Sequence, residues 1–139
     1  MIEINNLTNF RLDKELFTGL AKKALKGENR GTKTVSLAFV SKEEIKKLNN
    51  KFRKKNNPTD VLSFKLSEKN FLGEILICPE VVKKNAKKYR TDFEKELMKV
   101  FVHGILHLCG YKHEKSQKQA EIMEEKESFY LDGILNNKF

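Results

Sequence analysis

Three histidines, the only ones in the chain, lie in one short stretch, His103-Gly-Ile-Leu-His107-Leu-Cys-Gly110-Tyr-Lys-His113. On an α-helix, the imidazoles of His103 and His107 project from the same face, one turn apart. Gly110 fits the left-handed residue that ends a helix, and the chain beyond it can turn so that His113 reaches the same point. The spacing predicts one metal site with three imidazole ligands, rather than unrelated core or surface histidines.

Three neutral imidazoles suit zinc best among the common ions, and a three-histidine zinc site usually leaves the fourth position to water. A zinc ion lowers the pKa of its water to about 7 and polarises carbonyl or phosphoryl oxygens. We therefore expect one Zn2+ ion and a hydrolytic reaction. Cys109 is a weaker ligand candidate, because two residues after His107 it points off the histidine face.

The spacing of the histidines and Gly110 also matches metzincin peptidases, in which a glutamate directly follows the first histidine as general base. Here that position is Gly104. A peptidase would need its base elsewhere, for example at Asp60 or Glu74. The sequence weakens the peptidase hypothesis without excluding it.

Phosphodiester cleavage instead requires cations that hold the substrate and spread the charge of the transition state. Arg53 is the candidate, in a lysine-rich segment that continues into Lys54 and Lys55. The net charge of +9 and the pI near 9.5 favour a polyanionic partner, with nucleic acid first. The alternative is that these are solvated faces of a heat-adapted chain rich in lysine and glutamate.

The length of 139 residues predicts one domain, 1–139, large enough to bury a core. Cys78 and Cys109 lie in apolar surroundings, which favours reduced thiols in a cytoplasmic protein. We expect no signal peptide and no membrane span, because no apolar run approaches about 20 residues.

The elements that must position these residues alternate between strand and helix patterns. We expect strands near 2–4, 34–40, 59–66 and 71–78, and helices over 12–27, 41–55, 79–88 and 91–108, with a last helix after a polar linker. The segment 100–108 is apolar nearly all round, so its helix should be buried. This predicts an α+β domain: a sheet of about four strands, five or so helices, and the metal-binding helix central.

Capping boxes and helical spacing make this prediction more specific. Ser41 with Glu44, and Thr91 with Glu94, should open two of the helices. The expected apolar stripes are Ile45, Leu48 and Phe52 on the helix after Ser41, and Ile122, Met123, Phe129 and Tyr130 on the last helix.

Together these residues resemble the YbeY family, bacterial endoribonucleases of rRNA maturation. The resemblance rests on Asn49 to Arg53, Pro58-Thr-Asp-Val-Leu-Ser-Phe64, Gly73-Glu74 and the segment from His103 to His113. It implies a mixed sheet of four strands, zinc held by the three histidines, metal-dependent cleavage of single-stranded RNA, and a role in 16S rRNA processing and ribosome quality control. It also implies that Arg53 is the essential basic residue of the cleft.

One residue departs from the family pattern. The family usually has aspartate just before its third histidine, and this chain has Lys112. If that aspartate orients a ligand, its role is vacant or passes to Glu114, and metal affinity falls. Lys112 can instead contact a substrate phosphate.

We therefore predict a single-domain, zinc-dependent endoribonuclease in which Arg53 stabilises charge on the phosphoryl oxygens. Thr59, Asp60 and Ser63 would shape the cleft, although they can equally be residues that satisfy the loop backbone. The expected partner is RNA, in particular rRNA of the small ribosomal subunit, with no membrane and no organic cofactor. The alternative is a zinc-stabilised ribosome-binding factor without chemistry of its own, and a metzincin-like peptidase comes third.

Overall fold

The computed structural model describes residues 1–111 and 116–138, except for the side chains of 67 and 133–138. In these ranges four strands and five helices follow one another: β1 (Ile2–Asn6), α1 (Lys14–Gly27), β2 (Thr34–Phe39), α2 (Lys42–Arg53), β3 (Val61–Glu68), β4 (Phe71–Ile77), α3 (Pro79–Tyr89), α4 (Phe93–Leu108) and α5 (Gln117–Lys138). The expected α+β class is confirmed. Within these ranges, no helix has the length and apolar character needed to cross a bilayer.

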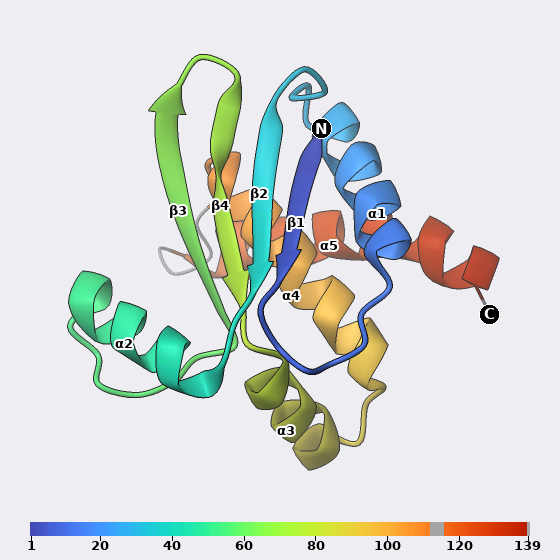
Figure 1. Cartoon of the computed structure of the whole chain (residues 1–139). Coiled ribbons are helices and arrows are strands. Elements are labelled where there is room, and N and C mark those ends of the chain that lie inside the picture. The colour runs from blue at the N-terminus through green and yellow to red at the C-terminus, as the bar shows by residue number, and fades with distance from the viewer. Residues whose placement is uncertain (112–115, 139) are drawn as a thin grey trace.

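The strands form one mixed sheet in the order β1-β2-β4-β3. β1, β2 and β4 are parallel, and β3 pairs with β4 in the antiparallel direction. This confirms the expected mixed sheet of four strands. β3 is therefore an edge strand of the sheet (Figure 1).

The main core lies on one face of the sheet, between the strands and helices α1, α4 and α5. Figure 1 shows α4 and α5 behind the sheet. Phe17 of α1 contacts Phe39 of β2 and Phe101 of α4 edge-on, with ring centroids 5.2 and 5.5 Å apart. The expected central position of α4 is confirmed, because its core residues are fully buried: Met98, Phe101, Val102, Ile105 and Leu106.

A smaller cluster on the opposite face joins α2 to the sheet, and its buried members are Val40, Ile45, Leu62, Leu76 and Cys78. The rings of Phe52 in α2 and Phe64 in β3 meet edge-on, 5.1 Å apart. Helices α2 and α4 therefore pack on opposite faces of the sheet, and β3 lies between them.

The helix starts agree with the predicted capping boxes in one case of two. Ser41 caps α2, since its hydroxyl accepts a hydrogen bond from the Glu44 backbone N–H at 3.2 Å. At α4 the cap is Asp92 instead of Thr91, and its carboxylate accepts from the Lys95 N–H at 3.0 Å. The Thr91 prediction was wrong because Thr91 takes part in the turn that ends α3, where its N–H bonds to the Ala86 carbonyl at 2.9 Å.

Two of the predicted apolar stripes were wrong in part. Phe52 is 55 % exposed and lies next to the last residue of α2. On α5, Met123 and Tyr130 are buried, whereas Ile122 and Phe129 are 40 % and 65 % exposed. On α5, exposed Ile122 directly precedes buried Met123, and exposed Phe129 directly precedes buried Tyr130. Side chains of adjacent residues on an α-helix differ in direction by about 100°. The buried pair, Met123 and Tyr130, therefore lies on a different face of α5 from the exposed pair, Ile122 and Phe129.

Candidate metal centre

The two histidines of α4 face each other across one helical turn. His103 Nε2 and His107 Nε2 lie 2.9 Å apart, and the ring centroids are 4.5 Å apart. Both side chains are half-buried. The i,i+4 spacing thus brings two ring nitrogens to one point, which is the arrangement that a shared metal ion requires.

Helix α4 ends as the sequence predicts. Gly110 has a φ of 104°, in the left-handed region. The Gly110 N–H bonds to the His107 carbonyl and the Tyr111 N–H to the Leu106 carbonyl, each at 3.0 Å. These bonds satisfy the last carbonyls of the helix and turn the chain sharply after Cys109.

The third predicted ligand, His113, lies outside the described residues, as do Lys112 and Glu114. Within residues 1–111 and 116–138, no group of three metal-binding side chains gathers. The three-histidine site therefore stays a prediction, of which the structure describes two members.

A buried carboxylate that we did not predict contacts the first histidine. Glu127 of α5 places its Oε1 2.5 Å from His103 Nδ1, and the residue is only 6 % exposed. The sequence does hold a signal for it, since Met123, Glu127 and Tyr130 follow the i, i+4, i+7 spacing of one helix face. A carboxylate on an otherwise apolar stripe is expensive unless it has a partner.

A second carboxylate anchors the chain just before the His113 segment, and its side chain is only 8 % exposed. Glu28, the C-cap residue of α1, accepts hydrogen bonds from the hydroxyls of Tyr111, at 2.7 Å, and Tyr130. Lys126 Nζ lies 3.7 Å from it. Burial alone would raise the pKa of Glu28, but the two tyrosines and Lys126 outweigh it and lower that pKa. Burial, and then the bond to Glu28, raise the pKa of Tyr111 to about 12.

In the described part of the chain, neither cysteine joins His103 and His107 in a group of three metal-binding side chains. Both are free thiols, and Cys78 is buried in the cluster below α2. Burial, followed by the charge of Glu28, raises the pKa of Cys109 to about 11.

Gly104 fills the position at which metzincins carry their base. A Cβ at this residue would lie 3.0 Å from Ile75 Cγ2 and 3.1 Å from Ser63 Oγ. Position 104 therefore faces the sheet, and a glutamate there would collide with β3 and β4. The glycine serves close packing of α4 on the sheet.

Neither carboxylate suggested as a replacement base reaches the histidines through a described contact. Glu74 lines a groove of about 480 Å³ together with Glu44 and Leu76, on the α2 face of the sheet. Asp60 is half-buried at the start of β3, where its carboxylate accepts from the Thr59 hydroxyl at 3.3 Å. Neither of these two suggested bases therefore supports the peptidase hypothesis in the described part of the chain.

Arg53, Lys54 and Lys55 are exposed at the end of α2, on the face opposite α4. Lys54 ends the helix in the left-handed conformation, with a φ of 56°. Buried Asn49 donates a hydrogen bond to the Asn57 carbonyl at 2.8 Å, which holds the lysine-bearing loop against α2. Among the described residues, none pairs with the Arg53 guanidinium. Arg53 thus belongs to a helix that packs on the other face of the sheet from the histidine-bearing helix α4.

Ser63 is the predicted cleft residue that the structure does bring to α4. Its hydroxyl lies on the α4 face of β3, beside Gly104. Strand alternation places Lys65 on the same face, exposed, and its charge acts on Cys109. Lys65 is a cation beside the end of α4 that we did not predict.

Comparisons with known proteins agree on one family. A family model described as endoribonuclease YbeY matches residues 3–134. A Thermotoga neapolitana protein named endoribonuclease YbeY is 46 % identical over 125 residues, covering 88 % of this chain and 83 % of the relative. Its Thermotoga maritima counterpart is 47 % identical over 100 residues, covering 72 % of this chain and 67 % of the relative.

The fold has a known counterpart as well. A Thermotoga maritima protein with a solution structure superposes with a TM-score of 0.71 at 39 % identity. The match covers 99 % of this chain and 91 % of that protein. The family model, the relatives and the shared fold give one conclusion: the chain belongs to the endoribonuclease YbeY family.

Proposed function

We propose that this chain is a zinc-dependent endoribonuclease that cleaves single-stranded RNA and acts in the cytoplasm, in 16S rRNA maturation and ribosome quality control. One observation carries the proposal: in a chain of this family, His103 Nε2 and His107 Nε2 converge to 2.9 Å on a buried helix. The relatives are named as endoribonucleases, which supports RNA as the substrate.

The residues present fit a zinc ion. Two nitrogens that bind zinc tetrahedrally, each about 2.05 Å from it, lie about 3.3 Å apart. The 2.9 Å separation of the two Nε2 atoms is close to that value, so a small ring rotation admits the ion. His113 would supply the third ligand. When bound, zinc supplies Lewis-acid polarisation of a phosphoryl oxygen and a water of lowered pKa.

The side chains around β3 define where RNA would bind. Arg53 would hold the phosphoryl oxygens with its planar donors, and Lys54 and Lys55 would neutralise neighbouring phosphates. Ser63 and Lys65 lie on the other face of the same edge strand. A single strand of RNA that passes over the β3 edge would therefore meet both groups, whereas a stiff duplex would not.

Thr59 and Asp60 have a supporting role in this proposal. They precede β3, and the Asp60 carbonyl accepts a hydrogen bond from the Cys78 N–H at 2.9 Å. That bond holds the segment between Arg53 and Ser63 to the residue that follows β4.

The test is cleavage of a labelled single-stranded RNA by purified protein, beside the same RNA in a duplex, with metal analysis of the fresh protein. We expect cleavage of the single strand, loss of activity with a chelator, and recovery on adding zinc. His107→Ala should be inactive. Full cleavage by pure His107→Ala would overturn the proposal, and zinc-loaded protein that binds RNA without cutting it would favour the ribosome-binding alternative.

A further inference from the structure

We propose that Glu127 is a positioning residue of the metal centre, which orients the ring of His103 and fixes its tautomer so that Nε2 faces the ion. The inference rests on the proposed function in one respect, namely that His103 is a metal ligand. It assigns a role to the last helix, α5, which none of the predicted ligands belongs to.

The contact itself sets the tautomer. Glu127 Oε1 lies 2.5 Å from His103 Nδ1, and only 27 % of the His103 side chain and 8 % of the Glu127 side chain are exposed. A carboxylate accepts a hydrogen bond but donates none, so Nδ1 carries the hydrogen. In a neutral imidazole this leaves the lone pair on Nε2, the atom that faces His107.

The same contact sets the angle of the ring. Glu127 is held on the buried stripe of α5 between Met123 and Tyr130. A carboxylate fixed at this depth allows the His103 ring little freedom to turn about its axis. Ligand histidines generally donate their second ring nitrogen in this way, and the acceptor raises the basicity of the ligating nitrogen.

Glu127 cannot itself be a ligand of the same ion through this oxygen. Oε1 contacts Nδ1, and Nδ1 and Nε2 lie on different edges of the imidazole, so the carboxylate is on the side of the ring away from His107. Lys126, its neighbour, pairs with Glu28 instead. The geometry therefore assigns Glu127 to the ring of His103 alone.

Fold stability gives a weak reason for a carboxylate at this position. Taking a charge out of water is costly, and a well-packed apolar residue is often equal or better for stability. A purely structural role predicts that substitutions change unfolding and leave metal binding unaffected. A positioning role predicts that they weaken metal binding even where the fold persists.

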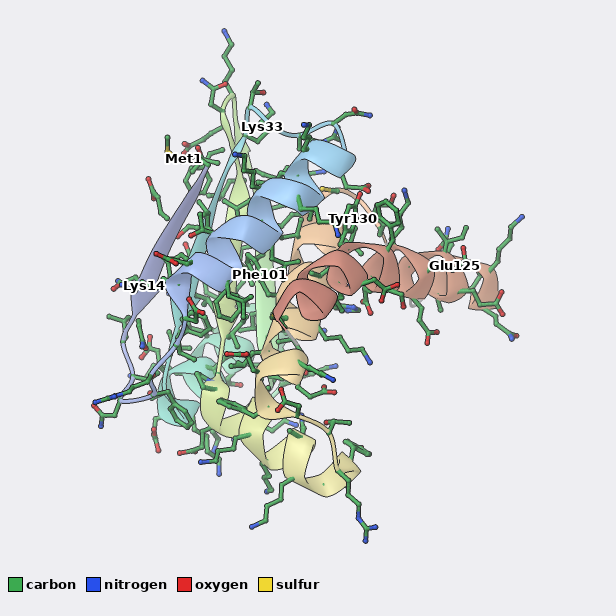
Figure 2. The ribbon with its side chains drawn as sticks, turned by 90° about the vertical axis from the view of Figure 1, so that its right-hand side faces the viewer. Met1, Lys14, Lys33, Phe101, Glu125 and Tyr130 are labelled. Carbon is green, nitrogen blue, oxygen red and sulfur yellow. The ribbon has the colours of Figure 1, made fainter. Side chains whose placement is uncertain are left out.

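The experiment measures zinc affinity in competition with a chromophoric chelator, for the wild-type protein, Glu127→Ala and Glu127→Gln. The matched control is Glu125→Ala, an exposed residue two positions earlier, which Figure 2 labels on the part of α5 that extends from the body. We expect a loss of about 10- to 100-fold for Glu127→Ala. Glu127→Gln should lose less, because its amide oxygen still accepts the hydrogen bond, and Glu125→Ala should match the wild type.

A second readout uses no metal. Imidazole nitrogen shifts in the NMR spectrum of the metal-free protein should show His103 protonated at Nδ1 in the wild type, and a mixture of tautomers in Glu127→Ala. Thermal unfolding of each variant reports whether the fold persists. If Glu127→Ala does not fold, Glu127→Gln, which keeps the volume, gives the same comparison.

The outcomes separate the two proposals. Unchanged zinc affinity in both Glu127 variants, with a wild type that binds zinc, overturns this inference and leaves the proposed function standing. A wild-type protein that binds no zinc overturns both.

Discussion

The carboxylate of Glu28 and the hydroxyl of Tyr111 are joined by a hydrogen bond of 2.7 Å across 83 residues of sequence. One partner ends the first helix, and the other precedes the His113 segment. Tyr130 of α5 reaches the same carboxylate, beside Gly27, where a Cβ would overlap its hydroxyl. Figure 2 shows Tyr130 where α5 passes the end of α1. Three helices therefore fix the start of that segment.

Tyr111→Phe should lower the free energy of unfolding by about 1–3 kcal/mol, because it removes a hydrogen bond to a nearly buried carboxylate. Urea denaturation measures the change. The control is Tyr89→Phe, at a tyrosine that is 66 % exposed, which should leave stability unchanged. Equal stability of the two variants would mean that Tyr130 and Lys126 satisfy Glu28 without Tyr111.

The stability of the protein should depend on Glu28 in acid. The folded state holds the pKa of Glu28 below its ordinary value of 4.5, so the unfolded chain takes up a proton first as the pH falls. Above pH 4.5, Glu28 makes its full contribution to the free energy of unfolding. That contribution is lost as the pH falls through the pKa that Glu28 has in the folded state.

Glu28→Gln should therefore be less stable than the wild type at neutral pH, and the difference should shrink in this acid range. Unfolding curves recorded over a pH series measure it. A difference that stays constant with pH would show that the carboxylate has the same pKa folded and unfolded.

Gly73→Ala should destabilise the protein by at least about 1–3 kcal/mol, because the new Cβ would overlap the Phe64 carbonyl oxygen and Leu108. Gly19→Ala is the matched control. Nothing lies within 4 Å of a Cβ at Gly19, inside α1, so alanine there should stabilise by about 0.5–1 kcal/mol. In thermal or urea unfolding, Gly73→Ala should lower the stability and Gly19→Ala should raise it. Two changes in stability of the same sign would contradict this account.

Arg53→Ala should slow RNA cleavage by about 100-fold, the effect of removing one donor to transition-state charge. Zinc affinity and unfolding should stay at wild-type values, because Arg53 is exposed and belongs to α2, whereas the described histidines belong to α4. Lys47→Ala, also exposed on α2, is the control for general charge loss. If both variants cleave alike, Arg53 contributes only to the overall positive field.

Much of the fold could be predicted from local patterns. Alternation located the strands, helical spacing and Gly110 located the end of α4, and the apolar run around Phe101 identified the central helix. These features depend on residues close in sequence. The sheet faces that α2 and α4 cover could not be predicted in this way, since they depend on contacts between elements far apart in the sequence.

The two carboxylate contacts were missed for the same reason. Glu127 and His103 are 24 residues apart, and Glu28 and Tyr111 are 83 apart. Nothing in the local sequence of α1 distinguishes Glu28 from the exposed acidic residues near it. Glu127 was detectable, because a helix face that includes Met123 and Tyr130 should bury whatever lies between them.

The burial of α4 has a consequence for how an ion would be captured. The backbone around each histidine is held within the core by its buried apolar neighbours on α4, which are Phe101, Val102, Ile105 and Leu106. The backbone entropy of His103 and His107 is therefore lost when the chain folds, and little of it would remain to be lost if a cation bound there.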